Sequence, residues 1–321
     1  MPLISHSTYT SPKLLFNKHL QTIYPSLFRK VKGVNYRRER IDTPDNDFLD
    51  LDWSIAGADK IGILSHGLEG DTGRSYMLGM AKALNRAGWD ALAWNYRSCS
   101  GEPNRLLRSY HSGATDDLDV VVSHVIRQNK YKKIALVGFS LGGNITLKYI
   151  GEHGKEINPL IKKGVAFSVP CDLASSAEVL AQPSNKIYMN RFLKMLCEKV
   201  QAKKERMPGQ IDDAGFEEIK DFKTFDDRYT APLNGFADAE DYWNKCSSRQ
   251  FLPNIAIPTL LLNAQNDPFL SKECFPVKEA EENPCFYLEM PKSGGHVGFV
   301  QFNSGGEYWS EKRAVGFLQC G

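Results

Sequence analysis

Residues 133–144 read Lys-Ile-Ala-Leu-Val-Gly-Phe-Ser-Leu-Gly-Gly-Asn, a short β-rich run that leads into Gly-x-Ser-x-Gly. The apolar spacing of residues 144–150 then predicts a helix. A serine on such a sharp turn from strand to helix has a strained backbone, and the residues two places before and after it must be small so that strand and helix can pack closely. Gly138 and Gly142 meet this requirement. We therefore expect the Ser140 hydroxyl to stand at the end of a sheet.

Strand and helix patterns alternate on both sides of this stretch. The sequence predicts further strands at residues 41–55 (with a turn at 44–46), 61–65, 90–95, 164–169, 257–263 and 285–290, and further helices at 76–87, 115–128 and 308–318. This alternation predicts an α/β fold with a mainly parallel central sheet and helices on both of its faces.

The alternation stops between residues 172 and 253, where the chain is more polar and largely helical in pattern. We interpret residues 172–253 as a helical cap inserted into the core, which would then consist of residues 1–171 and 254–321. Residues 186–206 carry seven basic and two acidic side chains beside an apolar face. Such a helix can pack over a site or lie on a lipid surface, and the two interpretations are compatible.

Composition excludes several classes of protein. With 40 basic and 38 acidic residues among 321, the net charge of +2 provides no electrostatic reason to bind nucleic acid. The seven cysteines contain no C-x-x-C pair, which disfavours both a disulfide framework and a zinc site. No Walker A or G-x-G-x-x-G motif is present, so no nucleotide cofactor is expected.

The sequence also bears on where the protein acts. Residues 1–18 are polar and mixed, without the apolar core of a signal peptide, and no apolar run is long enough to cross a bilayer. The simplest expectation is a cytoplasmic protein. The oligomeric state is left open by these features.

A serine hydroxyl becomes a nucleophile only when a histidine takes its proton, and a carboxylate must orient that histidine. Asp267 follows a predicted strand at a proline turn, and His296 lies in the Gly-rich loop after the next strand, so the order is Ser140, acid, histidine. Asp172, which follows the preceding strand, is a rival for the acid. We expect His66 and His111 to be structural.

Acyl transfer also requires N–H groups directed at the developing oxyanion. The backbone N–H of Leu141, next to the nucleophile, is one candidate. The other is the backbone N–H of Leu68 in the loop His66-Gly-Leu-Glu-Gly70, whose glycines allow amides to turn inward. The alternative for this loop is an ordinary glycine turn.

These motifs support a resemblance that extends over almost the whole chain. The chain resembles the YheT-like branch of the α/β-hydrolases, whose eukaryotic relatives include acylglycerol lipases and phospholipases. The motifs that carry the resemblance are Asn17-Lys-His-Leu-Gln-Thr-Ile23, His66-Gly-Leu-Glu-Gly70, Asn95-Tyr-Arg97, Cys99-Ser-Gly-Glu-Pro-Asn104, Tyr110-His-Ser-Gly113, Gly138-Phe-Ser-Leu-Gly-Gly-Asn144, Phe225-Asp-Asp227, Thr230-Ala-Pro-Leu233 and Gly295-His-Val-Gly-Phe299.

The resemblance implies the α/β-hydrolase fold and a carboxylic-ester hydrolase. We expect neither a cofactor nor a metal. Its Ser–Asp–His triad maps onto Ser140, Asp267 and His296. The substrates implied are glycerides or simple esters, and the apolar cap favours a medium or long acyl chain. One departure is Ser98, where the branch usually has glycine. If that position requires a positive φ, serine adopts it at some cost.

We therefore expect a serine esterase that acts on a small-molecule acyl ester. Two alternatives stay open at this point. An acyltransferase or thioesterase could use the same triad with another acceptor, and a non-catalytic binding protein could retain the fold.

Overall fold

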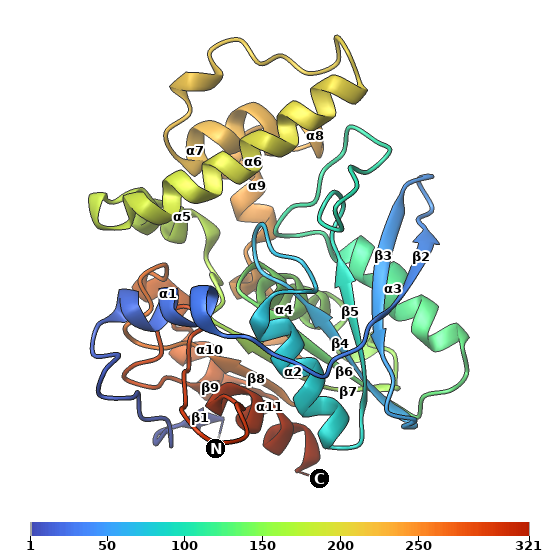
Figure 1. Cartoon of the computed structure of the whole chain (residues 1–321), viewed down its shortest axis with the longest axis vertical. Helices are drawn as coiled ribbons and strands as arrows, with labels where there is room; N and C mark the ends of the chain where they lie inside the picture. The colour runs from blue at the N-terminus through green and yellow to red at the C-terminus, as the bar shows by residue number, and fades with distance from the viewer. Residues whose placement is uncertain (1, 321) are drawn as a thin grey trace.

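The computed structural model describes residues 2–320, and these residues contain a nine-stranded sheet in the order β1-β9-β8-β7-β6-β4-β5-β3-β2 (Figure 1). Neighbouring strands are parallel except that β3 runs antiparallel to both β5 and β2. The strands are β1 (Leu3–Ile4), β2 (Arg37–Asp42), β3 (Phe48–Ser54), β4 (Lys60–Ser65), β5 (Asp90–Asn95), β6 (Lys133–Phe139), β7 (Ile161–Phe167), β8 (Thr259–Leu262) and β9 (Phe286–Glu289). The predicted mainly parallel sheet is confirmed.

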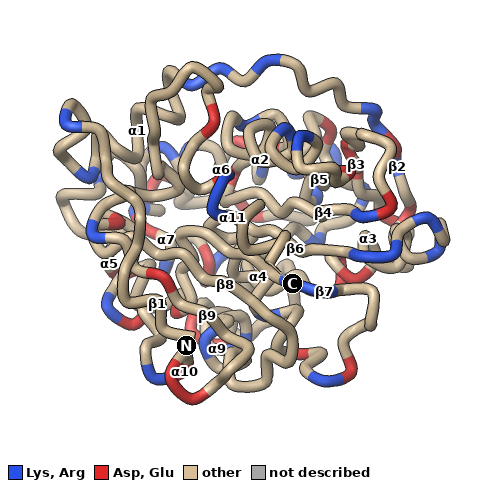
Figure 2. The backbone as a smooth tube through the Cα atoms, turned by 90° about the horizontal axis from the view of Figure 1, so that it is seen from below, with Lys and Arg blue, Asp and Glu red and all other residues tan. Residues whose placement is uncertain are grey.

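Helices cover both faces of this sheet. The α-helices are α1 (Lys18–Phe28), α2 (Ser75–Arg86), α3 (Thr115–Arg127), α4 (Leu141–His153), α5 (Leu173–Ala181), α6 (Lys186–Arg206), α7 (Phe222–Phe225), α8 (Ala231–Leu233), α9 (Ala239–Cys246), α10 (Val277–Glu282) and α11 (Trp309–Gln319). Because strand side chains alternate, Ile63 of β4 packs with α3 and α4, whereas Leu64 packs with α2 and α11. Basic and acidic positions are interspersed along the chain (Figure 2).

The chain between β7 and β8 forms α5 to α9, which lie above the carboxyl ends of the parallel strands (Figure 1). The apolar side of α6 is buried there, where Met189, Leu193 and Val200 pack in one cluster with Phe225 and Tyr229. Residues 226–230, between α7 and α8, form a turn of π-helix, a conformation that frequently marks functional sites.

A buried ion-pair network joins the end of β5 to its surroundings. The Arg97 side chain is 1% exposed, and its Nε and Nη2 donate to Asp117 on α3 at 2.9 and 2.7 Å. Its Nη1 donates to Asp45 and Asp47 in the β2–β3 turn at 2.8 and 3.0 Å. One guanidinium therefore holds together three segments that are distant in the chain.

Ser98, the departure from the branch pattern, has a φ of 63°. Its hydroxyl donates to Asn104 Oδ1 at 2.6 Å and accepts from the Asn104 N–H at 3.0 Å. These two hydrogen bonds offset the cost of a positive φ in a residue that is not glycine. The serine therefore adopts the conformation that a glycine would adopt with less strain.

Replacing Arg97 with methionine is expected to lower the free energy of unfolding by about 3–5 kcal/mol, because Asp47 and Asp117 would stay buried without their cation. Denaturant unfolding followed by circular dichroism measures this loss. The matched control is Arg105→Met, which removes an exposed pair with Asp42 and should cost less than about 1 kcal/mol. Similar losses in the two variants would contradict the prediction.

Candidate active site

The turn between β6 and α4 places Ser140 at the carboxyl edge of the sheet. Ser140 has φ 54° and ψ −121°, and its N–H donates to the Phe167 carbonyl oxygen at 2.8 Å. A Cβ on Gly138 would lie 2.3 Å from the Gly142 carbonyl oxygen, and one on Gly142 would lie 2.4 Å from the carbonyl oxygens of Ser65 and His66. Both glycines are therefore required by the close approach of strand, helix and neighbouring loop.

Three of the predicted site residues meet in one chain of hydrogen bonds. His296 Nε2 lies 2.9 Å from Ser140 Oγ, and His296 Nδ1 lies 2.9 Å from Asp267 Oδ2. The Asp267 side chain is fully buried, and its Oδ1 also accepts the Phe269 N–H at 2.9 Å. This arrangement can orient the imidazole so that Nε2 accepts a proton from the serine.

Asp172, the other candidate for the acid, has different hydrogen-bond partners. It caps the N-terminus of α5, where its carboxylate accepts the Ser175 N–H at 3.0 Å and the Ser175 hydroxyl at 2.7 Å. The carboxylate beside His296 is therefore that of Asp267.

The two predicted N–H donors flank Ser140. Leu141 is the first residue of α4, where an N–H has no partner inside the helix. Leu68 lies in a turn closed by the Gly70 N–H and the Gly67 carbonyl oxygen at 3.0 Å, and it lines the same cavity as Ser140 and Leu141.

The turn that contains Leu68 is also held by the side chain of its neighbour, Glu69. Glu69 follows Leu68 with a φ of 52°. Its carboxylate bonds the Lys199 ammonium of α6 at 3.0 Å and accepts the Tyr110 hydroxyl at 2.5 Å. An α6 residue therefore contributes to the shape of the turn beside the serine.

His66 and His111 are buried and remain neutral. Burial lowers the pKa of each imidazole to about 3. His66 Nδ1 lies 2.8 Å from the Gly67 carbonyl oxygen, and its Nε2 accepts the Tyr96 N–H at 3.3 Å. These contacts stabilise the loop after β4.

Helix α1, which sequence reasoning did not identify, supports the loop that carries His296. Thr22 Oγ1 accepts the His296 N–H at 2.9 Å, and Gln21 Oε1 accepts the Gly294 N–H at 2.9 Å. Ser168 Oγ accepts the next N–H along this loop at 2.8 Å. In the sequence, the sign of this contact was the motif of residues 17–23. That motif contributed to the family resemblance, but no role was assigned to it.

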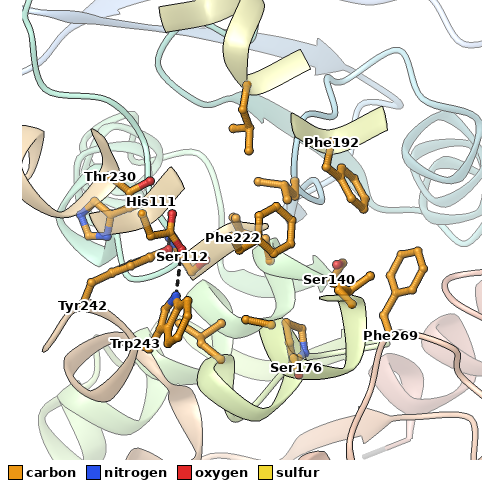
Figure 3. A pocket seen from close by; sticks show the side chains of 18 of the residues that line it. His111, Ser112, Ser140, Ser176, Phe192, Phe222, Thr230, Tyr242, Trp243 and Phe269 are labelled. Atoms are coloured by element: carbon orange, nitrogen blue, oxygen red, sulfur yellow. Dashed lines mark hydrogen bonds between the residues drawn. The ribbon is translucent and has the colours of Figure 1, made fainter. Parts of the chain in front are cut away.

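A cavity of about 800 Å³ extends from Ser140 beneath α6. Its walls are mainly apolar, with Phe192, Phe222 and Phe269 among the lining residues. Figure 3 shows Ser140 on one side of this cavity and Thr230 on the opposite side. A second cavity of about 990 Å³ also reaches Ser140 and passes between α1 and α6.

Asp226 brings a carboxyl group into the 800 Å³ cavity, where the Trp243 Nε1–H donates to its Oδ2 at 2.8 Å. This bond is the dashed line that starts at Trp243 in Figure 3. Burial raises the pKa of Asp226 from 3.8 to about 7. The cavity therefore has one carboxyl group within a mainly apolar lining.

Asp226→Asn is expected to remove a pH dependence of stability. Because the folded-state pKa lies above the unfolded value, the folded protein binds the extra proton between about pH 4 and pH 7, and wild-type stability falls as pH rises through that window. The wild type should lose up to roughly 4 kcal/mol relative to the variant across this window. Urea unfolding of both proteins between pH 4 and pH 8 measures the difference, and parallel curves would contradict the prediction.

Metal chemistry is not suggested by the side chains. Within residues 2–320, no group of three or more His, Cys, Asp or Glu residues is arranged to hold a metal ion.

Comparison with known proteins places the chain in a family. Residues 63–301 match the model of the alpha/beta hydrolase fold. The chain is 33% identical to the Escherichia coli protein named "Putative esterase YheT", over 94% of this chain and 90% of that protein. It is 31% identical to mouse phospholipase ABHD3, over 88% of this chain and 70% of that protein.

More distant relatives agree in fold. A monoacylglycerol lipase of Saccharomyces cerevisiae is 25% identical over 96% of this chain and 80% of that protein. The solved structure of a Pyrococcus furiosus esterase superposes with a TM-score of 0.60 at 20% identity, covering 91% of this chain and 95% of that one. The chain therefore belongs to the α/β-hydrolase family, in its YheT-like branch.

Proposed function

We propose that this protein is a serine carboxylic-ester hydrolase with Ser140 as nucleophile, His296 as base and Asp267 as orienting acid. The observation that carries the proposal is the unbroken chain of hydrogen bonds, each 2.9 Å long, from Ser140 Oγ through His296 to Asp267. Curated relatives named as an esterase, a phospholipase and a monoacylglycerol lipase support the same reaction class.

In this proposal, His296 Nε2 takes the Ser140 proton while Oγ attacks the ester carbonyl carbon. The resulting imidazolium gives that proton to the leaving alcohol, which leaves an acyl-enzyme. Water, activated by the same nitrogen, then attacks the acyl carbon and releases the acid and the free serine. The negative charge of Asp267 stabilises the imidazolium during both steps.

The oxyanion of each tetrahedral intermediate is assigned to the N–H groups of Leu68 and Leu141. The loop position of Leu68 and the helix N-terminus at Leu141 both favour negative charge on a substrate oxygen. The Lys199–Glu69 contact would keep the Leu68 turn in shape during turnover.

We assign residues 172–253 as the cap of the catalytic core, which comprises residues 1–171 and 254–321. The cap supplies Phe192 and Phe222 to the cavity beside Ser140. The mainly apolar lining of this cavity suits a medium or long acyl chain, so we propose acyl esters or glycerides as substrates.

A fluorophosphonate probe tests the nucleophile. It should label the folded protein at Ser140, as read by mass spectrometry of the labelled peptide, and denatured protein serves as the control. If folded protein that turns over an ester carried no label, the assignment of Ser140 as the nucleophile would be wrong.

The substrate class is tested separately. A chain-length series of p-nitrophenyl esters, run beside a monoacylglycerol and a phospholipid, should show kcat/KM rising with acyl length. A preference for acetate would contradict the assigned acyl class. Product analysis with added alcohol or thiol separates hydrolysis from acyl transfer.

A further inference from the structure

Helix α1 presents its apolar side to solvent. Leu20, Leu27 and Phe28 are 42%, 60% and 65% exposed, and together with Tyr24 they follow the i, i+4, i+7, i+8 spacing of one helix face. Gln21, which lies close to Phe28 around the helix, is 1% exposed and bonds the loop of His296. A surface helix of a globular protein normally buries its apolar stripe, whereas most of the α1 stripe is exposed.

The exposed apolar surface continues beyond α1. Phe302 is 53% exposed, and the Tyr24 ring packs against it at 5.7 Å between centroids. Ile187, at the start of α6, is 76% exposed, and its neighbour Tyr188 bonds His19 of α1 at 3.0 Å.

Large exposed hydrophobic side chains concentrate in this region. Within residues 2–320 there are eight of them: five lie between residues 14 and 28, Phe302 and Ile187 are the two described above, and Ile55 is the eighth. We call the other seven the α1 patch: Leu14, Phe16, Leu20, Leu27, Phe28, Ile187 and Phe302. Exposed apolar groups gathered in this way mark an interaction site, whereas scattered ones do not.

Exposed basic residues flank α1 and the start of α6, and the acidic residues near them, Glu307 and Glu311, lie on the side of Arg29. No acidic residue precedes Glu39 in the chain, whereas Lys13, Lys18 and Lys30 are exposed there. The first three turns of α6 likewise carry exposed Lys186, Arg191 and Lys194 and no acidic residue before residue 198. An apolar stripe with basic flanks is complementary to the surface of an anionic bilayer.

We propose that the α1 patch docks this protein on an anionic lipid surface, with α1 lying in the plane of the membrane–water interface. Among residues 2–320, no helix combines the length and the apolar character of a membrane span. Docking would involve Phe16 and Phe28 as apolar anchors and the lysines as electrostatic contacts.

Other residues of α1 and of the start of α6 line a route to the site. Thr22 and Ser26 of α1 and Tyr188 and Arg191 of α6 line the 990 Å³ cavity that reaches Ser140. A lipid leaving the docked surface would therefore find a route between the two helices. The apolar side of α6 itself is buried. Of the two interpretations of residues 186–206, packing over the site therefore accounts for that side, and we assign the lipid contact to α1 and to Ile187 at the start of α6.

The experiment measures vesicle binding by the Ser140→Ala protein, so that no lipid is turned over. It compares vesicles of phosphatidylcholine with vesicles of equal parts phosphatidylcholine and phosphatidylglycerol in a flotation assay. We expect binding to the anionic vesicles that weakens as NaCl is raised. Adding Phe16→Gln and Phe28→Gln should lower the partition coefficient about 10-fold for each ring.

Ile55→Gln is the matched control, because it removes an exposed apolar side chain outside the α1 patch and should leave binding unchanged. Circular dichroism checks that every variant is folded. Equal binding by the double variant and the parent would overturn the proposal. So would sedimentation data showing a dimer that the double variant dissociates, since the patch would then join two copies of the chain.

This inference is independent of the proposed hydrolysis, because vesicle binding needs no turnover. Failure to bind vesicles would leave fluorophosphonate labelling of Ser140 unaffected, and failure of labelling would leave vesicle binding unaffected.

Discussion

Replacing Ser140 with alanine should lower the turnover of p-nitrophenyl esters roughly a million-fold, because the residual rate then depends only on binding and on the oxyanion donors. The fold should persist, since alanine at this position has no larger side chain to fit and Ser140 Oγ serves only the His296 contact. Steady-state kinetics with purified protein measures the loss, and thermal unfolding verifies the fold.

Ser176→Ala is the matched control for this variant. Ser176 lines the same cavity as Ser140, but its hydroxyl contacts Cys274 Sγ at 3.2 Å. We expect its turnover to stay within about 10-fold of the wild type, in the range of a lost neutral hydrogen bond. If the Ser140 variant retained most of its activity, another residue would have to be the nucleophile.

Asp267→Asn should lower kcat roughly 10⁴-fold with little change in KM, because the amide stabilises the wrong tautomer of His296 and cannot balance an imidazolium. Substrate contacts remain, so the loss falls on the chemical step. Initial rates over a range of ester concentrations separate kcat from KM.

Asp172→Asn distinguishes the two acids that the sequence left as rivals. Asparagine can still cap α5 by accepting the Ser175 N–H, so activity close to that of the wild type is expected. A severe loss in Asp172→Asn together with an active Asp267→Asn would reverse the assignment of the acid.

Much of the fold could be predicted from local patterns. The strand at residues 90–95 and the helix at residues 115–128 agree with β5 and α3 to within one residue, because apolar periodicity reports burial directly. Helix α1 was missed although its stripe is regular. Gln21 and Thr22 hold α1 in place through hydrogen bonds to groups more than 270 positions away. Local sequence patterns do not predict such contacts.

The candidate site, like the fold, could be predicted only in part. Residue types, glycine spacing and the order serine, acid, histidine are properties of short segments. They were sufficient to select Ser140, Asp267 and His296 as candidates, with Asp172 as a rival for the acid. The placement of Asp226 at the cavity wall could not be predicted, because it depends on a π-helical turn and on Trp243 from another helix.

The sequence by itself determined the alternation of strands and helices and the sharp turn that carries Ser140, because periodicity and the absence of side chains at two glycines act over a few residues. Only the tertiary structure decided that Asp267 and not Asp172 lies 2.9 Å from His296, and that the apolar stripe of α1 faces solvent. Those outcomes depend on how segments distant in the chain pack together, which is set by the shape and burial of the whole core.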